Sequence, residues 1–298
     1  QRGPAGFAKT LALKTIHASL GDDAQFVQMF LAEARLAALI NHPNVVQIFD
    51  LSDSAESLFL AMEYVPGFDL AKIMDASLKQ RRLVPPPLAA RVIADAAAGL
   101  DAAHRLTDSR GRRRPVVHRD ISPENLLVSE VGQVKVVDFG IARAGEGQAM
   151  MRSSSGRLKG KVHYHAPEHI RDQEIDGRAD VYALGVVLYE LLCARRPFEG
   201  LGEADVMRAC IERDAPPPSK YYPAADAELS ELAMRALVRE PQKRPTAGEF
   251  RDMLEAYLRR HPCSLSDVER YLQEIIPLDA PERLVGKKLL SAAPEPAR

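Results

Sequence analysis

The sequence has few cysteines, no excess of either charge and no long apolar run. Its three cysteines, Cys193, Cys210 and Cys263, are odd in number, far apart and set in apolar helical patterns. We therefore expect buried thiols in a reducing compartment and no disulfide framework. The 40 basic and 41 acidic residues leave a formal net charge of −1, so we expect no chain-wide attraction to nucleic acid or to an anionic membrane.

The longest apolar run, VYALGVVLYELLC at 181–193, is too short to span a bilayer, and no signal-peptide pattern precedes the fold. We therefore expect a cytoplasmic domain, which a segment beyond residue 298 is free to tether to a membrane. The sequence begins with Gln and ends in SAAPEPAR, a polar stretch typical of the start of a linker. We expect both ends to be cuts in a longer protein.

Apolar residues make up 46% and charged residues 27% of the 298 residues, enough for one large domain or two lobes. Apolar patterns predict strands at 10–16, 45–51 and 58–65 around a helix at 24–40. Later patterns predict helices at 85–106, 180–194, 203–213, 227–239 and 246–260. The order predicts an α+β fold with a small antiparallel-sheet lobe, a larger helical lobe and a cleft between them.

Three parts follow from this pattern. We assign 1–65 to the small lobe and hinge, 66–262 to the large lobe, and 263–298 to a C-terminal helix and the start of a linker. The stretch CSLSDVERYLQEIIP at 263–277 has the pattern of an amphipathic helix. Whether it packs within the chain or recruits a partner is open.

Two motifs carry the chemistry. HRDISPEN contains Asp120 and Asn125, and VKVVDFG places Asp138 18 residues after Asp120. Together they resemble the motifs of Hanks-type protein kinases, specifically the bacterial serine/threonine type, which implies the bilobal protein-kinase fold. A carboxylate at Asp120 can orient a hydroxyl and accept its proton. Asn125 and Asp138 can supply oxygen ligands for Mg²⁺ ions that bridge the phosphates of ATP.

The resemblance runs from residue 9 to about 260 in the family's order. LALK resembles the strand with the phosphate-binding lysine, which is Lys14 here, and FLAEARL offers Glu33 as its ion-pair partner. This pair would fix the ammonium against the α- and β-phosphates.

The stretch AMEYVPGFDL resembles the hinge of the family. The resemblance implies that Met62 lines the back of the adenine pocket and that the backbone of Glu63 and Val65 binds the base. Asp69 would reach the ribose, although helix capping explains Asp69 equally well.

Three charged residues of the large lobe match structural positions of the family. HAPEH ends the Ala-Pro-Glu motif at Glu168, and KRPTA supplies Arg244, its ion-pair partner in the family. ADVYALG supplies Asp180, which would support the backbone of the catalytic loop. A charge within such an apolar helix needs a partner, so a structural role is expected on physical grounds as well.

Arg119, directly before Asp120, resembles the arginine of those family members whose activation loop is ordered by a phosphate. A phosphoryl group would bind Arg119 and Arg143, and the run MMRSSSGRLKGK offers Ser153, Ser154 and Ser155 as acceptors of self-phosphorylation. The alternative is that this Ser/Gly run is a flexible loop.

Two further clusters allow other interpretations. His163, His165 and His169 have spacings that suit a transition metal, but they fall within the expected substrate-docking segment. The basic run RGRRRP at 110–115 suits an acidic partner, and a solvated loop is the simpler interpretation.

The sequence departs from the family in its first residues. Only thirteen residues precede Lys14, and RGPAGFAK lacks the G-x-G-x-x-G spacing of the loop that covers the ATP phosphates. We expect that the first strand and the glycine loop are missing because the sequence is a fragment, and that residues 1–298 alone are a poor enzyme. The alternative is a pseudokinase without the loop.

A second departure concerns Ser122 and Lys161. The family usually has Lys where Ser122 stands and Thr where Lys161 stands, and both positions flank the catalytic Asp. We expect an exchange of roles, in which Lys161 brings its ammonium to Asp120 and the γ-phosphate while the Ser122 hydroxyl bridges. The alternative is that Lys161 faces solvent and selects acidic substrates.

The resemblance implies a serine/threonine protein kinase that uses ATP and Mg²⁺, with Mn²⁺ as an alternative ion, to phosphorylate protein hydroxyls in bacterial signalling. Two other functions stay open. A small-molecule phosphotransferase with a kinase-like fold would share the Asp and Asn residues but would not need Glu168, Asp180 and Arg244. A pseudokinase acting as a binding module usually lacks the Lys, the catalytic Asp or the metal-binding Asp, and all three are present.

Overall fold

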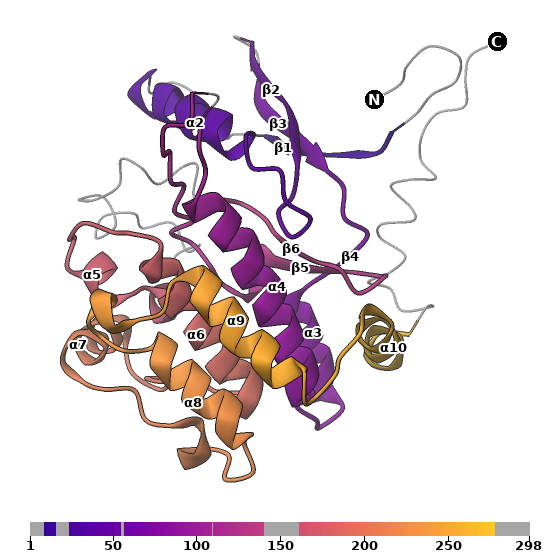
Figure 1. The fold of residues 1–298 in the computed structure, drawn as a ribbon, viewed down its shortest axis with the longest axis vertical. Coiled ribbons are helices and arrows are strands. Elements are labelled where there is room, and N and C mark those ends of the chain that lie inside the picture. Colours follow the sequence, from indigo (N-terminus) through magenta and orange to yellow (C-terminus); the bar gives the residue numbers. More distant parts are fainter. Residues whose placement is uncertain (1–8, 16–23, 55–56, 109, 140–160, 278–298) are drawn as a thin grey trace.

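A computed structural model describes residues 9–15, 24–54, 57–108, 110–139 and 161–277 (Figure 1). Within these residues, a small lobe built on a β-sheet lies at the top of the view in Figure 1 and a larger helical lobe lies below it. The predicted α+β architecture of two unequal lobes is confirmed.

The small lobe contains an antiparallel sheet with the strand order β1-β3-β2. Its strands are β1 (Leu11–Thr15), β2 (Ile48–Ser54) and β3 (Ser57–Glu63). The register of β1 and β3 places Lys14 directly opposite Leu60. Since residues directly opposite each other share a face of the sheet, Lys14 lies on the same face as the buried side chain of Leu60.

Helix α2 (Ala24–Ala37) lies beside this sheet (Figure 1). Phe30, Ala34 and Ala37 are buried, and their spacing puts them on one face of the helix. The sequence predicted that this helix ends at residue 40, but it ends at Ala37. A turn then carries the chain to Ile40, whose side chain is buried.

A second sheet joins the two lobes. Its strands, in the order β4-β5-β6, are β4 (Gly67–Asp69), β5 (Leu126–Ser129) and β6 (Val134–Val136). A Cβ atom at Gly67 would lie 2.1 Å from the carbonyl oxygen of Val128, so only glycine fits there. The amide of Val46 donates to the carbonyl of Val136, and the amide of Val136 donates to the carbonyl of Asn44. These bonds explain why β2 begins at Ile48 and not at residue 45.

Helices make up most of the large lobe. Those in the described residues are α3 (Leu70–Lys79), α4 (Pro86–His104), α5 (Pro167–Ile170), α6 (Arg178–Cys193), α7 (Glu203–Glu212), α8 (Ala227–Ala236), α9 (Ala247–Leu258) and α10 (Leu265–Ile275). Short 3-10 turns occur at η2 (Pro123–Asn125), η3 (Lys161–Tyr164), η4 (Pro218–Lys220) and η5 (Pro241–Lys243). The five helices predicted beyond residue 84 are present, with ends shifted by up to three residues.

Helix α6 is buried on nearly all sides and contacts α4, α8 and α9. Its apolar residues therefore continue around the whole helix instead of forming one stripe, as expected of a helix enclosed by others. A Cβ atom at Gly185 would lie 2.6 Å from the Cβ of Ala236, so the glycine permits the close approach of α6 and α8.

Helix α10 packs within the chain against α3, which answers the question that the sequence left open. The hydroxyls of Tyr271 and Ser77 lie 2.6 Å apart, and Gln80 donates to the carbonyl of Ile275. Ser264 and Asp267 form a capping box that starts the helix. The chain therefore stays part of one folded body as far as Ile276, which is also buried.

The three cysteines are free and buried, as expected from the sequence. Among the described residues, no helix has both the length and the apolar character needed to cross a bilayer.

Candidate active site

The loop that precedes β5 brings Asp120 and Asn125 together. The Asn125 amide nitrogen donates to the backbone carbonyl of Asp120 at 2.6 Å and to its Oδ2 atom at 3.2 Å. The turn η2 makes this side-chain contact possible, because the backbone N–H of Asn125 donates to the carbonyl of Ser122 and so fixes the position of Asn125. Both N–H bonds of the Asn125 side chain thus point at Asp120, which directs its amide oxygen elsewhere.

Asp180 supports this loop from below. Its carboxylate accepts hydrogen bonds from the backbone amides of His118 and Arg119 at 2.8 Å each, and from the ring of His104 at 2.8 Å. Burial alone raises the pKa of Asp180, but the hydrogen bonds from the His104 ring and the His118 backbone, together with the electrostatic effect of these residues, outweigh burial, so the pKa lies below its ordinary value. Asp180 is 1% exposed, and it has the hydrogen-bond partners that its burial requires.

His118 connects the loop to the strand that carries Asp138. Its Nε2 atom lies 2.8 Å from the carbonyl of Val137, and its Nδ1 atom accepts from the amide of Asp120. This arrangement places the ring proton on Nε2. Burial lowers the pKa of His118 despite the nearby carboxylate of Asp180, so the ring is neutral near pH 7.

Asp138 faces Lys14 from the small lobe. The Lys14 Nζ atom lies 2.7 Å from Asp138 Oδ1, and the two side chains are 43% and 40% exposed. Asp138 and Arg119 both adopt a left-handed backbone, with φ of 58° and 64°. Non-glycine residues in this region are uncommon and concentrate at functional sites. The predicted partner of Lys14, Glu33, lies on α2, but its side chain is outside the described part, so that pair stays a prediction.

A small cavity lies between the lobes beside Asp138. Its lining comes from both sheets and consists of Val46, Ile48, Leu60, Met62, Val136, Val137, Asp138 and Phe139. Met62 therefore stands at the cavity that the sequence predicts as the adenine pocket. Phe139 is buried and its ring lies 4.7 Å from that of His118, which couples this side of the cavity to the catalytic loop.

The other predicted nucleotide-binding residues, Glu63, Val65 and Asp69, follow Met62 in the sequence. The carboxylate of Glu63 pairs with Lys135 at 2.9 Å, a contact that the sequence did not predict. Val65 is partly buried in the segment that connects β3 and β4. Asp69 accepts from the amide of Lys72 and caps α3, which is the capping role that the sequence also allowed.

Lys161 contacts the catalytic loop directly. Its Nζ atom lies 2.7 Å from Asp120 Oδ2, with the side chains 26% and 15% exposed. The expectation that this ammonium approaches Asp120 is therefore met in distance. The expected bridge by Ser122 is absent, because its hydroxyl is buried and makes no hydrogen bond to any residue that the structure describes. Lys161 bonds directly to Asp120, so this contact does not need a bridging hydroxyl from Ser122.

Glu168 and Arg244 form a buried, two-pronged ion pair. The two guanidinium nitrogens donate to the two carboxylate oxygens at 2.6 and 2.7 Å. Arg244 also donates to the carbonyls of Val238 and Arg239, so its charge is well satisfied. The pair holds the segment that starts with Lys161 against the large lobe.

Tyr164 makes a second anchor for this segment, which sequence reasoning missed. Its hydroxyl donates to Glu190 on α6 at 2.6 Å. Burial, opposed by this hydrogen bond, raises the pKa of Glu190 above its ordinary value. A Tyr in one motif and a Glu in a distant helix leave no local pattern, so the contact was visible only in the structure.

The histidines do not form a metal site in the part of the chain that the structure describes, where no group of three or more His, Cys, Asp or Glu side chains is placed to hold an ion. The ring centroids of His165 and His169 instead lie 4.5 Å apart, with the ring planes tilted by 39°. Arg143 and the predicted acceptors Ser153, Ser154 and Ser155 lie outside the described residues.

The donor set beside the cavity suits a hard divalent cation. Asp138 offers carboxylate oxygens, and the Asn125 amide oxygen accepts no hydrogen bond from the residues that are described. The amide of Val137 donates to the carbonyl of Asn125, which keeps these two ligand positions adjacent. Carboxylate and amide oxygens are the ligands that Mg²⁺ and Mn²⁺ share, and the geometry does not choose between them.

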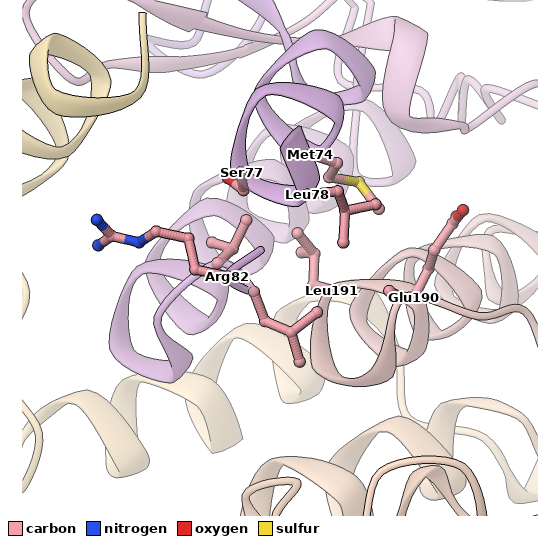
Figure 2. A pocket seen from close by; sticks show the side chains of 9 residues that line it. Met74, Ser77, Leu78, Arg82, Glu190 and Leu191 are labelled. Atoms are coloured by element: carbon pink, nitrogen blue, oxygen red, sulfur yellow. The ribbon is translucent and has the colours of Figure 1, made fainter. Parts of the chain in front are cut away.

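A second, apolar pocket lies between α3 and the C-terminal end of α6 (Figure 2). Figure 2 shows Met74 and Leu78 on one side and Leu191 on the other, with the guanidinium of Arg82 directed away from them. Its lining includes none of the predicted site residues. The pocket is therefore separate from the group around Asp120 and Asp138.

Comparisons with known proteins agree with this geometry. The family profile described as protein kinase domain matches residues 6–255. The chain is 41% identical over 260 residues to the tyrosine-protein kinase MasK of Myxococcus xanthus, covering 87% of this chain and 40% of that protein.

Two further relatives carry a different name. The serine/threonine-protein kinase Pkn1 of Myxococcus xanthus is 38% identical, with 84% of this chain and 35% of Pkn1 covered. The serine/threonine-protein kinase PknB of Mycobacterium tuberculosis is 33% identical, with 88% of this chain and 41% of PknB covered. The chain thus spans about two fifths of the length of the curated relatives that it matches.

Solved structures show the same fold. The crystal structure of the PknI kinase domain of Mycobacterium tuberculosis superimposes with a TM-score of 0.62 at 26% sequence identity. The match covers 84% of this chain and 86% of that one.

Proposed function

The chain belongs to the protein kinase family, and from this premise we propose that it transfers the γ-phosphoryl group of ATP to serine and threonine hydroxyls of a protein substrate. The observation that carries the proposal is the convergence of Lys14, Asp120, Asn125 and Asp138 on one site. Lys14 bonds to Asp138, Asn125 bonds to Asp120, and the Asn125 backbone bonds to the residue before Asp138.

Each of these residues has a role that its geometry supports. The Asp120 carboxylate orients the substrate hydroxyl and accepts its proton as the oxygen attacks the γ-phosphorus. Lys14 binds the α- and β-phosphates and, by our proposal, pairs with Glu33 when it does so. Asn125 and Asp138 hold the divalent ion, which when bound neutralises phosphate charge, and we propose Mg²⁺ before Mn²⁺ for that place.

We place the base of ATP in the cavity beside Asp138. Met62 forms its back wall, and the backbone of Glu63 and Val65 binds the adenine edge. Asp69 contacts the ribose only if its carboxylate serves both the sugar and the α3 amide that it caps.

Regulation and location complete the proposal. Phosphorylation of Ser153, Ser154 or Ser155 would place a phosphate beside Arg119 and Arg143 and order the activation loop. We propose a cytoplasmic kinase domain whose partners are protein substrates rather than nucleic acid.

Two observations favour a protein kinase over a small-molecule phosphotransferase. The Glu168–Arg244 pair and the Asp180 hydrogen bonds are both formed. Both serve to hold a docking segment and a catalytic loop for a large substrate. Lys14, Asp120 and Asp138 are all present. Lys14 contacts Asp138, and Asp120 contacts Lys161, which argues against a binding module without catalysis.

The test is Asp120→Asn in the full-length protein, assayed by phosphate transfer from ATP to dephosphorylated casein. We expect a loss of roughly 10²-fold or more in turnover, with unchanged binding of the ATP analogue AMP-PNP. Asp205→Asn, at an exposed position on α7, is the matched control and should keep full activity. Full activity of Asp120→Asn would contradict the proposal.

A further inference from the structure

Two lysines divide the two acidic groups of the site between them. Lys14 bonds to Asp138, on the side of the phosphates and the metal, and Lys161 bonds to Asp120, on the side where the hydroxyl attacks. The second contact joins residues 41 positions apart in the sequence. The ammonium beside the proposed base therefore comes from the segment of Glu168 and Tyr164, not from the catalytic loop itself.

The transfer reaction needs a cation at this place. Negative charge spreads over the equatorial oxygens of the phosphoryl group as it passes from ADP to the hydroxyl, and groups fixed beforehand against that charge are worth the most. Lys14 is committed to the far side of the phosphates. The side chain of Lys161 is 26% exposed, so it is partly shielded from the solvent that would weaken the field of its charge.

The catalytic loop offers no lysine of its own here. Ser122, two residues after Asp120, is 1% exposed and uncharged, and its hydroxyl bonds to none of the described residues. A buried hydroxyl without a partner beside the base is costly.

We propose that Lys161 is a catalytic residue whose ammonium lies between Asp120 and the γ-phosphoryl oxygens of ATP during transfer. The inference rests on the proposed kinase function. In the step, the bond from the substrate oxygen to the γ-phosphorus forms and the bond from that phosphorus to the β-phosphate oxygen breaks. ADP leaves with the electron pair, the hydroxyl proton passes to Asp120, and Lys161 keeps its three protons throughout.

A consequence is that the anchors of the docking segment position this cation. Tyr164 bonds to Glu190, and Glu168 bonds to Arg244. Tyr164 and Glu168 lie three and seven positions after Lys161 in the sequence. The charge available at Asp120 therefore depends on how that segment is held, which is not the case for a lysine on the catalytic loop.

The experiment compares Lys161→Thr, Ser122→Lys and the double variant in the full-length protein. Turnover on casein should fall roughly 10²-fold in Lys161→Thr. The double variant should recover part of the loss, with a coupling of roughly 2- to 150-fold between the two sites. Lys243→Thr, at an exposed lysine paired with Glu240, is the control and should match the wild type.

Calorimetry supplies a readout that does not depend on turnover. Because the γ-phosphoryl group is the part of ATP that Lys161 contacts in this proposal, Lys161→Thr should weaken AMP-PNP binding roughly tenfold and leave ADP binding unchanged. Lys161→Arg, which keeps the charge, should lose less than Lys161→Thr in both assays. Should thermal melting show that Lys161→Thr is unfolded, Lys161→Met takes its place. A fall in turnover and in the AMP-PNP to ADP affinity ratio in Lys161→Met, with a smaller fall in Lys161→Arg, would support the inference. No fall in Lys161→Met would refute it.

Three results would overturn the inference. One is wild-type turnover with an unchanged AMP-PNP to ADP ratio in Lys161→Thr. Another is strictly additive losses in the double variant. The third is a rise in KM for an acidic peptide alone with kcat unchanged, which would make Lys161 a substrate-selecting residue. A wild-type protein that neither binds AMP-PNP nor transfers phosphate would instead overturn the proposed function, and the inference with it.

Discussion

Two ion pairs of this molecule have similar chemistry and opposite surroundings. Lys14 and Asp138 meet at 2.7 Å between the lobes, with side chains 43% and 40% exposed. Arg244 and Glu168 meet at 2.6 Å within the large lobe, with side chains 0% and 4% exposed. An exposed pair contributes little to stability, whereas breaking a buried pair leaves an unpaired charge away from water. Exposure therefore separates charges that are available to a ligand from charges that hold the scaffold.

The hydrogen bonds around the two pairs support this separation. Arg244 uses its remaining N–H groups on backbone carbonyls, so the pair cannot open without losing several bonds. The Lys14 ammonium, by contrast, is held to Asp138 by a hydrogen bond of 2.7 Å that crosses between the lobes. This bond can exchange for bonds to phosphate and metal at little cost.

The largest effect is expected on turnover when the exposed pair is changed. Lys14→Met and Asp138→Asn should each abolish phosphate transfer in the full-length protein, by roughly 10²-fold or more. The free energy of unfolding should change by less than about 1 kcal/mol, because the pair is exposed. Kinetics with casein as substrate measure the turnover, and urea titration measures the free energy of unfolding. Near-normal turnover in either variant would end the assignment of these residues to the site.

The next effect is expected on stability when the buried pair is broken. Arg244→Met should lower the free energy of unfolding by about 3–5 kcal/mol, because Glu168 is left buried without its partner. Arg235→Met is the matched control, since Arg235 pairs with Glu231 in the open, and it should cost about 1 kcal/mol or less. Equal costs for the two variants in urea titration would remove the distinction between the pairs.

A smaller effect is expected where α10 meets α3. Tyr271→Phe removes the hydroxyl that lies 2.6 Å from Ser77 and should cost about 1 kcal/mol of unfolding free energy. Tyr222→Phe, at a residue that is 43% exposed, should change stability by no more than about 0.5 kcal/mol. No difference between the two variants would mean that the hydroxyl contact of α10 does not stabilise the large lobe.

The smallest effect concerns the pH dependence of Glu190. Burial raises the pKa of this carboxyl, so the folded state disfavours its charged form. Wild-type stability should therefore gain from this group as pH falls through its folded pKa, and the gain should be complete below the ordinary pKa of about 4.3. Glu190→Gln keeps an acceptor for Tyr164 and lacks this dependence.

The free energy of unfolding of Glu190→Gln should exceed that of the wild type by the largest amount near pH 8. This difference should vanish as the pH falls toward 4. Urea titrations at several pH values measure the difference. A difference that stays constant with pH would show that burial does not perturb Glu190.

The comparison also shows which contacts the sequence could predict. Asp120, Asn125 and Asp138 stand in short motifs with fixed spacing, and the turn and strands that hold them form locally. Asp180 and the Glu168–Arg244 pair were predictable because a charge in an apolar setting needs a partner. Helices with strong periodicity, such as 203–212, were predicted to within a residue.

Other contacts had no signal in the sequence. Tyr164 and Glu190, Lys135 and Glu63, and Tyr271 and Ser77 are 26, 72 and 194 positions apart, and no periodicity connects such pairs. The three-residue strand β4 is too short to show alternation. The Ser122 hydroxyl forms no hydrogen bond to any residue that the structure describes, and the approach of Lys161 from 41 positions away could not be judged without the fold.

We propose that the site around Asp120 phosphorylates serine and threonine of a protein. The most direct test of this proposal is to incubate the full-length protein with dephosphorylated casein, Mg²⁺ and ATP labelled at the γ-phosphate, and to identify the labelled amino acid after hydrolysis. We expect label on phosphoserine and phosphothreonine with the wild type and no label with Asp120→Asn. Label on phosphotyrosine alone, or no label from a protein that binds AMP-PNP, would contradict the proposal.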